Sequence, residues 1–170
     1  MKAFVITVSD SVYAGAATDR SGPAVREILE QHGWSVECEV LPDEAAMLGQ
    51  RLAKLAESNK YSLVVTTGGT GIGPRDVTPE ATRAVIEREI PGVAEWMRAA
   101  GAQKTKYALL SRGVAGTRGR TIILNLPGSP SGAVDSLQAV VDLLPHMVDL
   151  VSGKTGHGPR EGTEGEQTAT

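Results

Sequence analysis

Short apolar runs alternate with amphipathic segments along most of the 170-residue chain. The runs at 4–8 (FVITV) and 61–67 (YSLVVTT) are rich in β-branched residues, and RTIILNL at 120–126 has the same character. Runs of this length and composition predict strands that are buried on both faces. The stretch 34–41, WSVECEVL, alternates apolar and polar positions and predicts a fourth strand.

Helical spacing of apolar residues predicts two helices in the first half of the chain. The first begins at Ser21 and ends near Gly33. The second carries leucines at 48, 52 and 55, which lie on one helical face. Asp43 is expected to cap this second helix, because a short carboxylate can accept hydrogen bonds from the free N–H groups of the first turn.

The second half of the chain predicts three more helices. One is expected over 78–90, with Thr78 as its cap and Pro79 in its first turn. Pro91-Gly92 is expected to end it, and a further helix is predicted over 93–100, whereas 106–110 is ambiguous. The last helix is predicted over 133–150, with a bend before Pro145.

Alternation of strands and helices predicts an α/β sandwich built around a mostly parallel sheet. Residues 1–152 are expected to form a single domain, and 153–170, which have no apolar anchor, a flexible tail. Ligands of open α/β sheets bind beyond the carboxyl ends of the strands. The loops after Val8, Leu41, Thr67 and Leu126, which read SDS, PDE, GGTGIGPRD and PGSP, are therefore expected to gather at one edge.

The most unusual of these loops follows the third strand and reads TTGGTGIGPRD at 66–76. Its glycines can turn several N–H groups toward one anion, and Arg75 adds a guanidinium fork that matches phosphate oxygens. A carboxylate at Asp76 would repel phosphate unless a cation such as Mg²⁺ lay between them. The spacing matches neither the P-loop nor the dinucleotide-binding fingerprint.

A purely structural interpretation of these loops also stands. Glycine-rich turns are common connections, so the loop could simply close onto a well-capped helix. Asp43 and Ser129 could likewise serve only as helix caps. The convergence of four polar loops at one edge favours a ligand site over this alternative.

Composition excludes several classes of protein. The chain carries 17 Lys and Arg against 20 Asp and Glu, a net charge of −3, without any basic run, so nucleic acid is not an expected partner. The single cysteine, Cys38, is expected to be a buried or half-buried strand residue rather than a catalytic thiol. We expect a cytoplasmic protein, because the chain shows no disulfide pair, signal sequence or membrane span.

Histidines do not predict a metal site. His32, His146 and His157 lie in a helix end, a helix and the tail, without the regular spacing that zinc ligands show.

Six segments carry a family resemblance: VSDSVYAG, DRSGPA, LPDE, TTGGTGIGPRDVTPEAT, LLSRGVAGTRG and NLPGSP, which together span nearly all of 1–152. The chain resembles the MogA/MoaB family of molybdenum-cofactor biosynthesis, and most closely its MogA-type molybdopterin adenylyltransferases, which also occur as the G domain of gephyrin. The resemblance implies a three-layer α/β fold, a homotrimer, and adenylylation of molybdopterin by Mg-ATP with release of pyrophosphate. The product would pass to a molybdate-insertion protein of the MoeA type.

The resemblance also implies roles for particular residues. The two catalytic aspartates of the family fall on Asp43 and Asp76, with Asp76 expected to hold Mg²⁺ at the ATP phosphates and Asp43 to be a second ligand or to orient the nucleophile. Ser111 and Arg112 are expected to reach the pterin. The expected substrate- and nucleotide-binding residues are Gly68, Gly69, Thr70, Gly71, Arg75, Ser9, Asp10, Ser111, Arg112, Asn125, Gly128 and Ser129.

Two alternatives remain open within the family. The chain could be a MoaB-type protein that binds molybdopterin or serves as a scaffold without catalysis, although the presence of both aspartates favours an enzyme. A tungsten-cofactor pathway would use the same reaction. Trp34 and Trp96 are expected in the core or at subunit contacts rather than as stacking platforms for the pterin, since each lies in a periodic element.

Overall fold

A computed structural model describes residues 1–154 as alternating strands and helices. The strands are β1 (Lys2–Val8), β2 (Ser35–Leu41), β3 (Leu63–Thr67), β4 (Arg88–Glu89), β5 (Ala115–Arg118) and β6 (Thr121–Leu126). The helices are α1 (Asp10–Tyr13), α2 (Ser21–Gln31), α3 (Ala45–Glu57), α4 (Thr78–Arg83), α5 (Pro91–Ala102), α6 (Pro130–Gln138) and α7 (Leu144–Val151), with the 3₁₀ helices η1 (Lys106–Leu110) and η2 (Val141–Leu143).

One six-stranded sheet with the order β2-β1-β3-β6-β5-β4 forms the middle of the molecule. β2, β1, β3 and β6 run parallel, whereas β5 is antiparallel to both β6 and β4. The predicted mostly parallel α/β fold is thus confirmed. All four predicted strands form the parallel part of the sheet.

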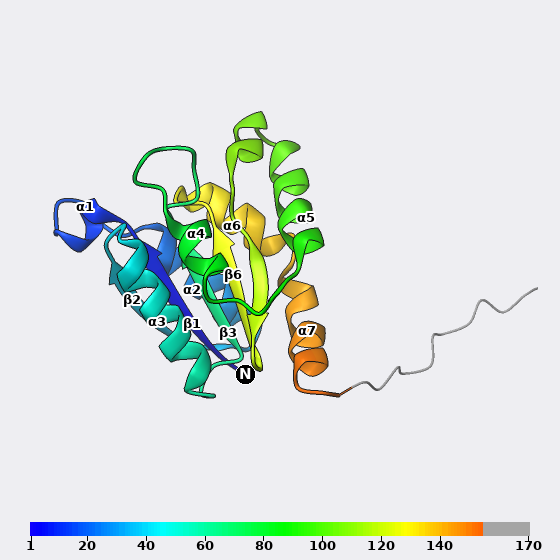
Figure 1. The fold of residues 1–170 in the computed structure, drawn as a ribbon. Coiled ribbons are helices and arrows are strands. Elements are labelled where there is room, and N and C mark those ends of the chain that lie inside the picture. Colours follow the sequence, from blue (N-terminus) through cyan, green and yellow to red (C-terminus); the bar gives the residue numbers. More distant parts are fainter. Residues whose placement is uncertain (155–170) are drawn as a thin grey trace, which may run out of the picture.

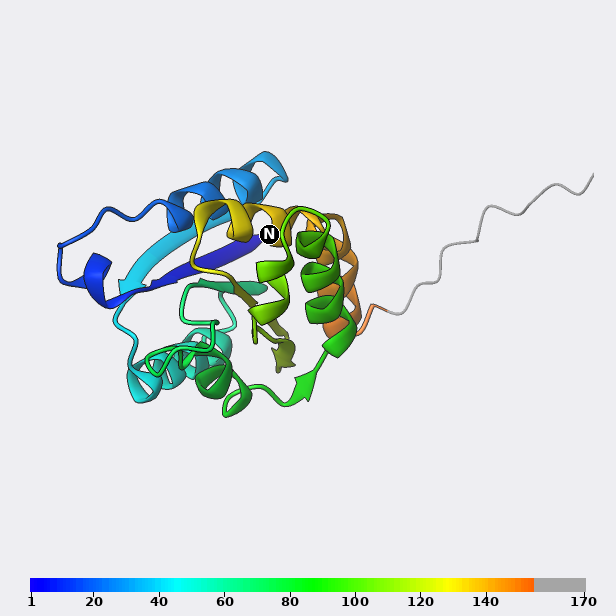
Figure 2. The ribbon, with the colours of Figure 1, turned by 90° about the horizontal axis from the view of Figure 1, so that it is seen from above.

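Helices cover both faces of the sheet and make three layers (Figures 1 and 2). Successive residues of a strand point to opposite faces. Accordingly Val5 and Val65 pack with α2, α5, α6 and α7, whereas Ile6 and Val64 pack with α3 and α4. Both faces of the central strands are buried, which explains why these strands read as continuous apolar runs.

Two predicted helix caps are wrong. α3 begins at Ala45, and Asp43 lies outside it because its carboxylate accepts a hydrogen bond from the Asp10 N–H instead. α4 already includes Thr78, whose hydroxyl donates to the Gly68 carbonyl at 2.9 Å. In both cases a contact with a distant loop replaces the local cap.

Several predicted boundaries also differ from the structure. The helix expected over 78–90 ends at Arg83, and Pro91 begins α5 instead of ending a helix. The ambiguous 106–110 forms η1, and the segment 133–150 is divided into α6, η2 and α7, with Pro145 in the first turn of α7. The tail expected over 153–170 lies almost wholly outside the described residues, as does His157.

Two further residues differ from their expected environments. Trp34 is buried as predicted. Trp96, expected in the core or at a subunit contact, is 58% exposed, which excludes the core and leaves the subunit contact as a prediction. Cys38 is exposed because β2 is an edge strand of the sheet. Within residues 1–154, no helix is both long and apolar enough to cross a bilayer.

Candidate functional site

The loops after β1, β2, β3 and β6 meet at the carboxyl end of the sheet, at the upper end in Figure 1. The Ser9 N–H donates to the Leu41 carbonyl at 2.9 Å, and the Gly68 N–H donates to the Leu126 carbonyl at 3.1 Å. These bonds join neighbouring strands just where each one ends. The predicted gathering of the four polar loops is confirmed.

Glycine is required where three of these loops touch. Gly68 has a φ of +109°, and a Cβ added there would lie 2.2 Å from the Val8 carbonyl oxygen. A Cβ on Gly128, in the loop after β6, would lie 3.2 Å from the Gly68 Cα. The main chains of the loops after β1, β3 and β6 therefore pack directly on one another.

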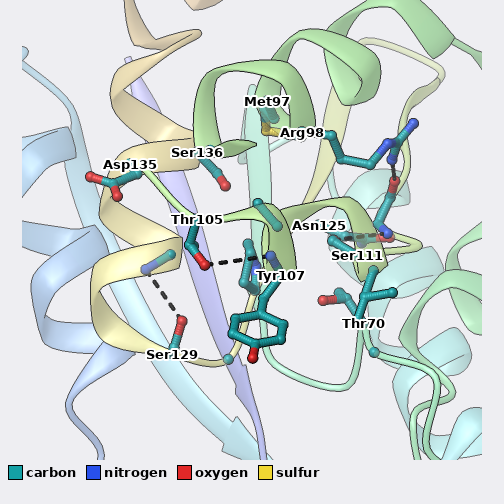
Figure 3. Close-up of a pocket in the computed structure, with 18 of the residues that line it drawn as sticks. Thr70, Met97, Arg98, Thr105, Tyr107, Ser111, Asn125, Ser129, Asp135 and Ser136 are labelled. Atoms are coloured by element: carbon teal, nitrogen blue, oxygen red, sulfur yellow. Dashed lines mark hydrogen bonds between the residues drawn. The ribbon is translucent and has the colours of Figure 1, made fainter. Parts of the chain in front are cut away.

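An apolar cavity of about 370 Å³ opens on one side of this contact (Figure 3). Its walls come from α5, η1, the glycine loop and the start of α6, and Tyr107 of η1, which is 78% exposed, lies at its mouth. We call it the apolar cavity, because apolar atoms make up most of its lining, from Ala94, Met97, Leu110 and Pro127 among others. Hydroxyl groups and the charged side chains of Asp76, Arg98 and Asp135 also line it. Cavities of this size with mostly apolar walls and a few polar groups commonly bind small organic ligands.

A second, polar cavity of about 630 Å³ opens on the other side. It is lined by the end of β1, by residues 17–21 at the start of α2, and by Asp43. Gly69, Asp76 and Gly128 line both cavities and form the wall between them. Two ligands, one in each cavity, would meet at this wall.

Asp43 and Asp10 hold the loops after β2 and β1 together. The Asp10 N–H donates to the Asp43 carboxylate at 2.9 Å, and the Asp43 N–H donates back to the Asp10 carboxylate at 3.0 Å. The bond from Asp43 lowers the pKa of Asp10. Burial, together with the negative charges of Asp10 and Asp76, raises the pKa of Asp43. The Asp43 carboxylate therefore lies where a cation would be favourable.

Asp76 lies within the glycine loop. Its carboxylate accepts a hydrogen bond from the Gly73 N–H at 2.8 Å, and a Cβ on Gly71 would lie only 2.9 Å from the same carboxylate. A Cβ on Gly69 would lie 3.0 Å from the Asp43 carboxylate. Both aspartates thus rest against glycine main chain and line the polar cavity.

Arg75, expected to bind phosphate, is paired with carboxylates in the structure. Its guanidinium lies 2.9 Å from the Asp10 carboxylate and 3.1 Å from that of Glu44. The side chain is 59% exposed, so it ties the glycine loop to the loops after β1 and β2 at the surface. A phosphate contact by Arg75 stays a prediction and would require exchange of these partners.

Ser111 and Arg112 are separated, although both were expected to reach one ligand. Ser111 lines the apolar cavity, whereas Arg112 does not. The Arg112 guanidinium turns toward the glycine loop and donates to the Gly71 and Asp76 carbonyls, each at 2.7 Å. Arg112 therefore contacts the loop and not the cavity.

The remaining expected residues fall into two groups. Thr70 and Ser129 line the apolar cavity, and Ser9 lines the polar one, with Ser9 and Ser129 also capping α1 and α6. Asn125 also lines the apolar cavity but is only 1% exposed. Its amide already donates to the Thr66 and Thr82 hydroxyls and accepts from the Val114 N–H, so it braces the sheet edge.

Sequence reasoning missed the far wall of the apolar cavity. Thr105, Tyr107, Asp135 and Met97 line it from η1, α6 and α5 (Figure 3). These residues carry no motif, and their helical spacing indicates only which face packs on the sheet. The one available signal was a polar residue, Asp135, beside apolar positions of a helix.

The donor set fits Mg²⁺ only if a substrate completes it. Among residues 1–154, no group of three or more His, Cys, Asp or Glu side chains is arranged to hold a metal ion. Asp43 and Asp76 nevertheless line the same polar cavity, and the negative charge of Asp76 contributes to the raised pKa of Asp43. Mg²⁺ in phosphate-binding sites takes one or two carboxylates and completes its shell with phosphate oxygens and water. The pair of aspartates meets that requirement.

Comparisons with known proteins agree with this site. The model of a family described as a probable molybdopterin binding domain matches residues 4–146. A molybdopterin adenylyltransferase of Helicobacter pylori is 38% identical over 152 residues, covering 88% of this chain and 86% of that protein. The molybdenum cofactor synthesis protein cinnamon of Drosophila melanogaster is 39% identical over 86% of this chain, which spans only 25% of that longer protein.

A solved structure shares the whole architecture. The crystal structure of the molybdopterin biosynthesis enzyme MoaB from Thermus thermophilus aligns with a TM-score of 0.84 at 50% sequence identity, over 90% of this chain and 97% of that one. The family match spans the strands and loops that build both cavities. We conclude that this chain belongs to the MogA/MoaB family of molybdopterin-binding domains of molybdenum-cofactor biosynthesis.

Proposed function

We propose that the chain is a molybdopterin adenylyltransferase that uses Mg-ATP and releases pyrophosphate. The observation that carries the proposal is the pair of cavities that share one wall, with Asp43 and Asp76 beside it. A reaction between two bound phosphate compounds needs such an arrangement. The relative from Helicobacter pylori bears the name of this activity, and it matches the chain over most of both lengths.

The reaction makes modest demands on the side chains. The second pKa of a phosphate monoester is about 6, so the terminal phosphate of molybdopterin is largely a dianion at neutral pH and needs no strong base. Its oxygen attacks the α-phosphorus of ATP and forms a new P–O bond. The bond from that phosphorus to the bridging oxygen breaks, and pyrophosphate leaves with the electron pair. Positioning and neutralisation of charge are the main tasks left to the protein.

Each cavity suits one part of this reaction. The apolar cavity, with Met97 and Tyr107, accepts a flat heteroaromatic ring, and Ser111 and Ser129 supply hydroxyls near its phosphate. The polar cavity accepts charged phosphates beside Asp43 and Asp76. The glycine main chain of the shared wall lies where the two phosphates would meet.

Asp43 and Asp76 would hold the Mg²⁺. The ion, when bound with ATP, neutralises negative charge on the phosphates. Asp76 is oriented for this role by the Gly73 N–H, and Asp43 by the Asp10 N–H. Both carboxylates therefore have one oxygen held by main chain, so little reorganisation is needed when the cation arrives.

We further propose a cytoplasmic homotrimer that hands its product to a molybdate-insertion protein of the MoeA type. Exposed apolar side chains support an assembly: Trp96, Leu143 and Leu150 on α5, η2 and α7 are each at least 47% exposed. Burial of such large exposed apolar groups against another copy would be favourable.

The proposal is tested by pyrophosphate release from ATP, Mg²⁺ and freshly prepared molybdopterin, with Asp76→Asn beside the wild type. We expect pterin-dependent release by the wild type and a loss of about a hundredfold or more in the variant. The fold should persist, because Asp76 lies in an exposed loop and asparagine can still accept from the Gly73 N–H.

Two results would contradict the proposal. Wild-type turnover by Asp76→Asn would remove the carboxylate from the mechanism. Absence of release by a wild-type protein that still binds molybdopterin would replace the enzyme by a binding protein of the same family.

A further inference from the structure

Arg112 makes several hydrogen bonds to the main chain of the glycine loop and to the helix that follows it. Its Nε donates to the Gly71 carbonyl and one Nη to the Asp76 carbonyl, both at 2.7 Å. The other Nη donates to the Glu80 carboxylate in α4. Its own N–H donates to the Thr70 carbonyl at 2.8 Å. One residue thus spans both ends of the loop and the helix after it.

Besides Arg112, the exposed Arg75 ties residues 70–76 to the rest of the protein, through ion pairs with Asp10 and Glu44 at the surface. Ile72, the loop's one large apolar side chain, is 72% exposed and provides no anchor in the core. Within the loop, the Asp76 N–H donates to the Gly73 carbonyl at 3.1 Å, and the Gly73 N–H donates to the Asp76 carboxylate. Both bonds are internal, so they shape the turn without fixing it to the rest of the protein. Glycine-rich main chain has high conformational freedom unless such contacts remove it.

We infer that Arg112 is a positioning residue, which holds the loop 70–76 in the conformation that presents the Asp76 carboxylate to the metal and the phosphates. This inference rests on the proposed function. Arg112 acts through the loop and does not touch the ligand, since it lines neither cavity.

The geometry of the peptide unit adds a second effect. In a trans peptide the C=O and the following N–H point in opposite directions. Because Arg112 binds the Gly71 and Asp76 carbonyls, it also sets the directions of the N–H groups of Ile72 and Val77. The loop's main-chain donors are thereby oriented before any anion arrives.

Arginine is suited to this task and lysine is not. The planar guanidinium carries five N–H groups, and four of its hydrogen bonds go to three acceptor groups in Gly71, Asp76 and Glu80. That leaves too few free N–H groups for a bidentate contact with a phosphate. A lysine ammonium is a single point and cannot span these acceptors at once.

The first test measures the loop itself, by hydrogen–deuterium exchange of the amides 70–77 in the protein without ligand. Arg112→Lys is compared with Arg118→Lys, because Arg118 also joins a main-chain carbonyl, that of Val85, to a glutamate, Glu57. We expect exchange in 70–77 to be about tenfold faster in Arg112→Lys and unchanged in Arg118→Lys. Equal exchange in all three proteins would overturn the inference.

The second test separates positioning from binding. In Arg112→Lys we expect kcat to fall by about a hundredfold and the Mg²⁺ concentration for half-maximal rate to rise, with little change in the KM for molybdopterin. A raised pterin KM with normal kcat would mean that Arg112 binds the pterin directly, and would overturn the inference.

Failure of this inference can be told from failure of the proposed function. If the wild type itself released no pyrophosphate, the proposed adenylyltransferase activity would be wrong. The hydrogen–deuterium exchange experiment would still decide whether Arg112 holds the loop. Glu80→Gln gives a milder variant, which keeps both bonds to the carbonyls. Its exchange in 70–77 should lie between those of the wild type and Arg112→Lys, and exchange as fast as in Arg112→Lys would count against the carbonyl contacts.

Discussion

Asp43 bears a negative charge in a place that disfavours it. Burial is the main cause of its raised pKa, followed among the raising effects by the charges of Asp10 and Asp76, while the Asp10 N–H and Arg75 act in the opposite direction. A residue kept charged in such surroundings is typical of a functional site. The unfavourable repulsion is relieved only when a cation is present.

Asp43→Asn should therefore make the ligand-free protein slightly more stable at neutral pH while removing activity. The folded pKa is above the unfolded one, so ionisation of Asp43 opposes folding at neutral pH. The advantage of the variant should shrink as the pH falls through the folded pKa toward 3.8, because both proteins are then neutral at this position. Thermal unfolding of both proteins between pH 7 and pH 4 checks this, and a variant less stable at pH 7 would contradict it.

Particular residues show what the sequence could indicate at this scale. Asp76 was predicted because a carboxylate beside glycine-rich, phosphate-binding main chain is chemically conspicuous, whereas the role of Asp43 was implied only by the family resemblance. The partners of Arg75 and Arg112 were not predicted, since Asp10, Glu44 and Glu80 lie on other loops and helices. An arginine's choice among carboxylates, carbonyls and ligand phosphates depends on distances that only the folded chain supplies.

At the scale of elements, the site depends on how closely the ends of β1, β3 and β6 approach. Gly68 lies between the Val8 carbonyl and Gly128, and Thr78 at the start of α4 donates to its carbonyl. No side chain fits between these segments.

Gly68→Ala should thus destabilise the protein strongly. The added Cβ would lie 2.2 Å from the Val8 carbonyl oxygen, and the φ of +109° is strained for any residue with a side chain. Together the clash and the strain should cost about 3 kcal/mol or more of unfolding free energy. Urea unfolding measures this.

Gly119→Ala is the matched control. Gly119 also has a positive φ, of +53°, but a Cβ there would meet nothing within 4 Å. Its cost should be about 1 kcal/mol, from the backbone alone. Equal losses of unfolding free energy in the two variants would show that the close approach of the strand ends does not affect stability.

Elements with strong local signals were predicted well, and those that depend on distant partners were not. The apolar strands β1, β3 and β6 and the amphipathic helices α2 and α3 are confirmed, as is α5 with an earlier start. The antiparallel strands β4 and β5 were missed, because β4 has only two residues and β5 reads AGTR, which contains no apolar run. Pairing across the sheet, rather than composition, makes them strands.

For the molecule as a whole, binding should appear as a gain in thermal stability. A ligand of the native state at 100 times its Kd stabilises by about 2.7 kcal/mol. We expect Mg-ATP and molybdopterin each to raise the melting temperature, since under the proposed function each would occupy its own cavity.

Removal of the metal should separate the two ligands. With excess EDTA the shift caused by ATP should be largely lost, because Asp43 and Asp76 would then face the phosphates without a cation. The increase in melting temperature caused by molybdopterin should persist in part, because its ring would still bind. An undiminished ATP shift in EDTA would contradict the metal role of the two aspartates.

The α/β sandwich around a mostly parallel sheet could be predicted from the alternation of elements, and so could the edge at which the polar loops gather. The two cavities could not. They are formed by α5, η1 and α6 on one side and by the start of α2 on the other, and α2, α5 and α6 are packed through side chains of one core on the same face of the sheet. The division of the site by a glycine wall is a property of the assembled loops.

That wall has a consequence for anyone who wishes to redesign the protein. Gly69 and Gly128 have no side chains to exchange, and under the proposed function Asp76 would hold the metal. New substrate preferences must therefore be introduced at the outer ends, at Tyr107 for the ring and at Thr18 or Arg20 for the phosphates. The reaction centre and the two recognition ends can in this way be altered independently of one another.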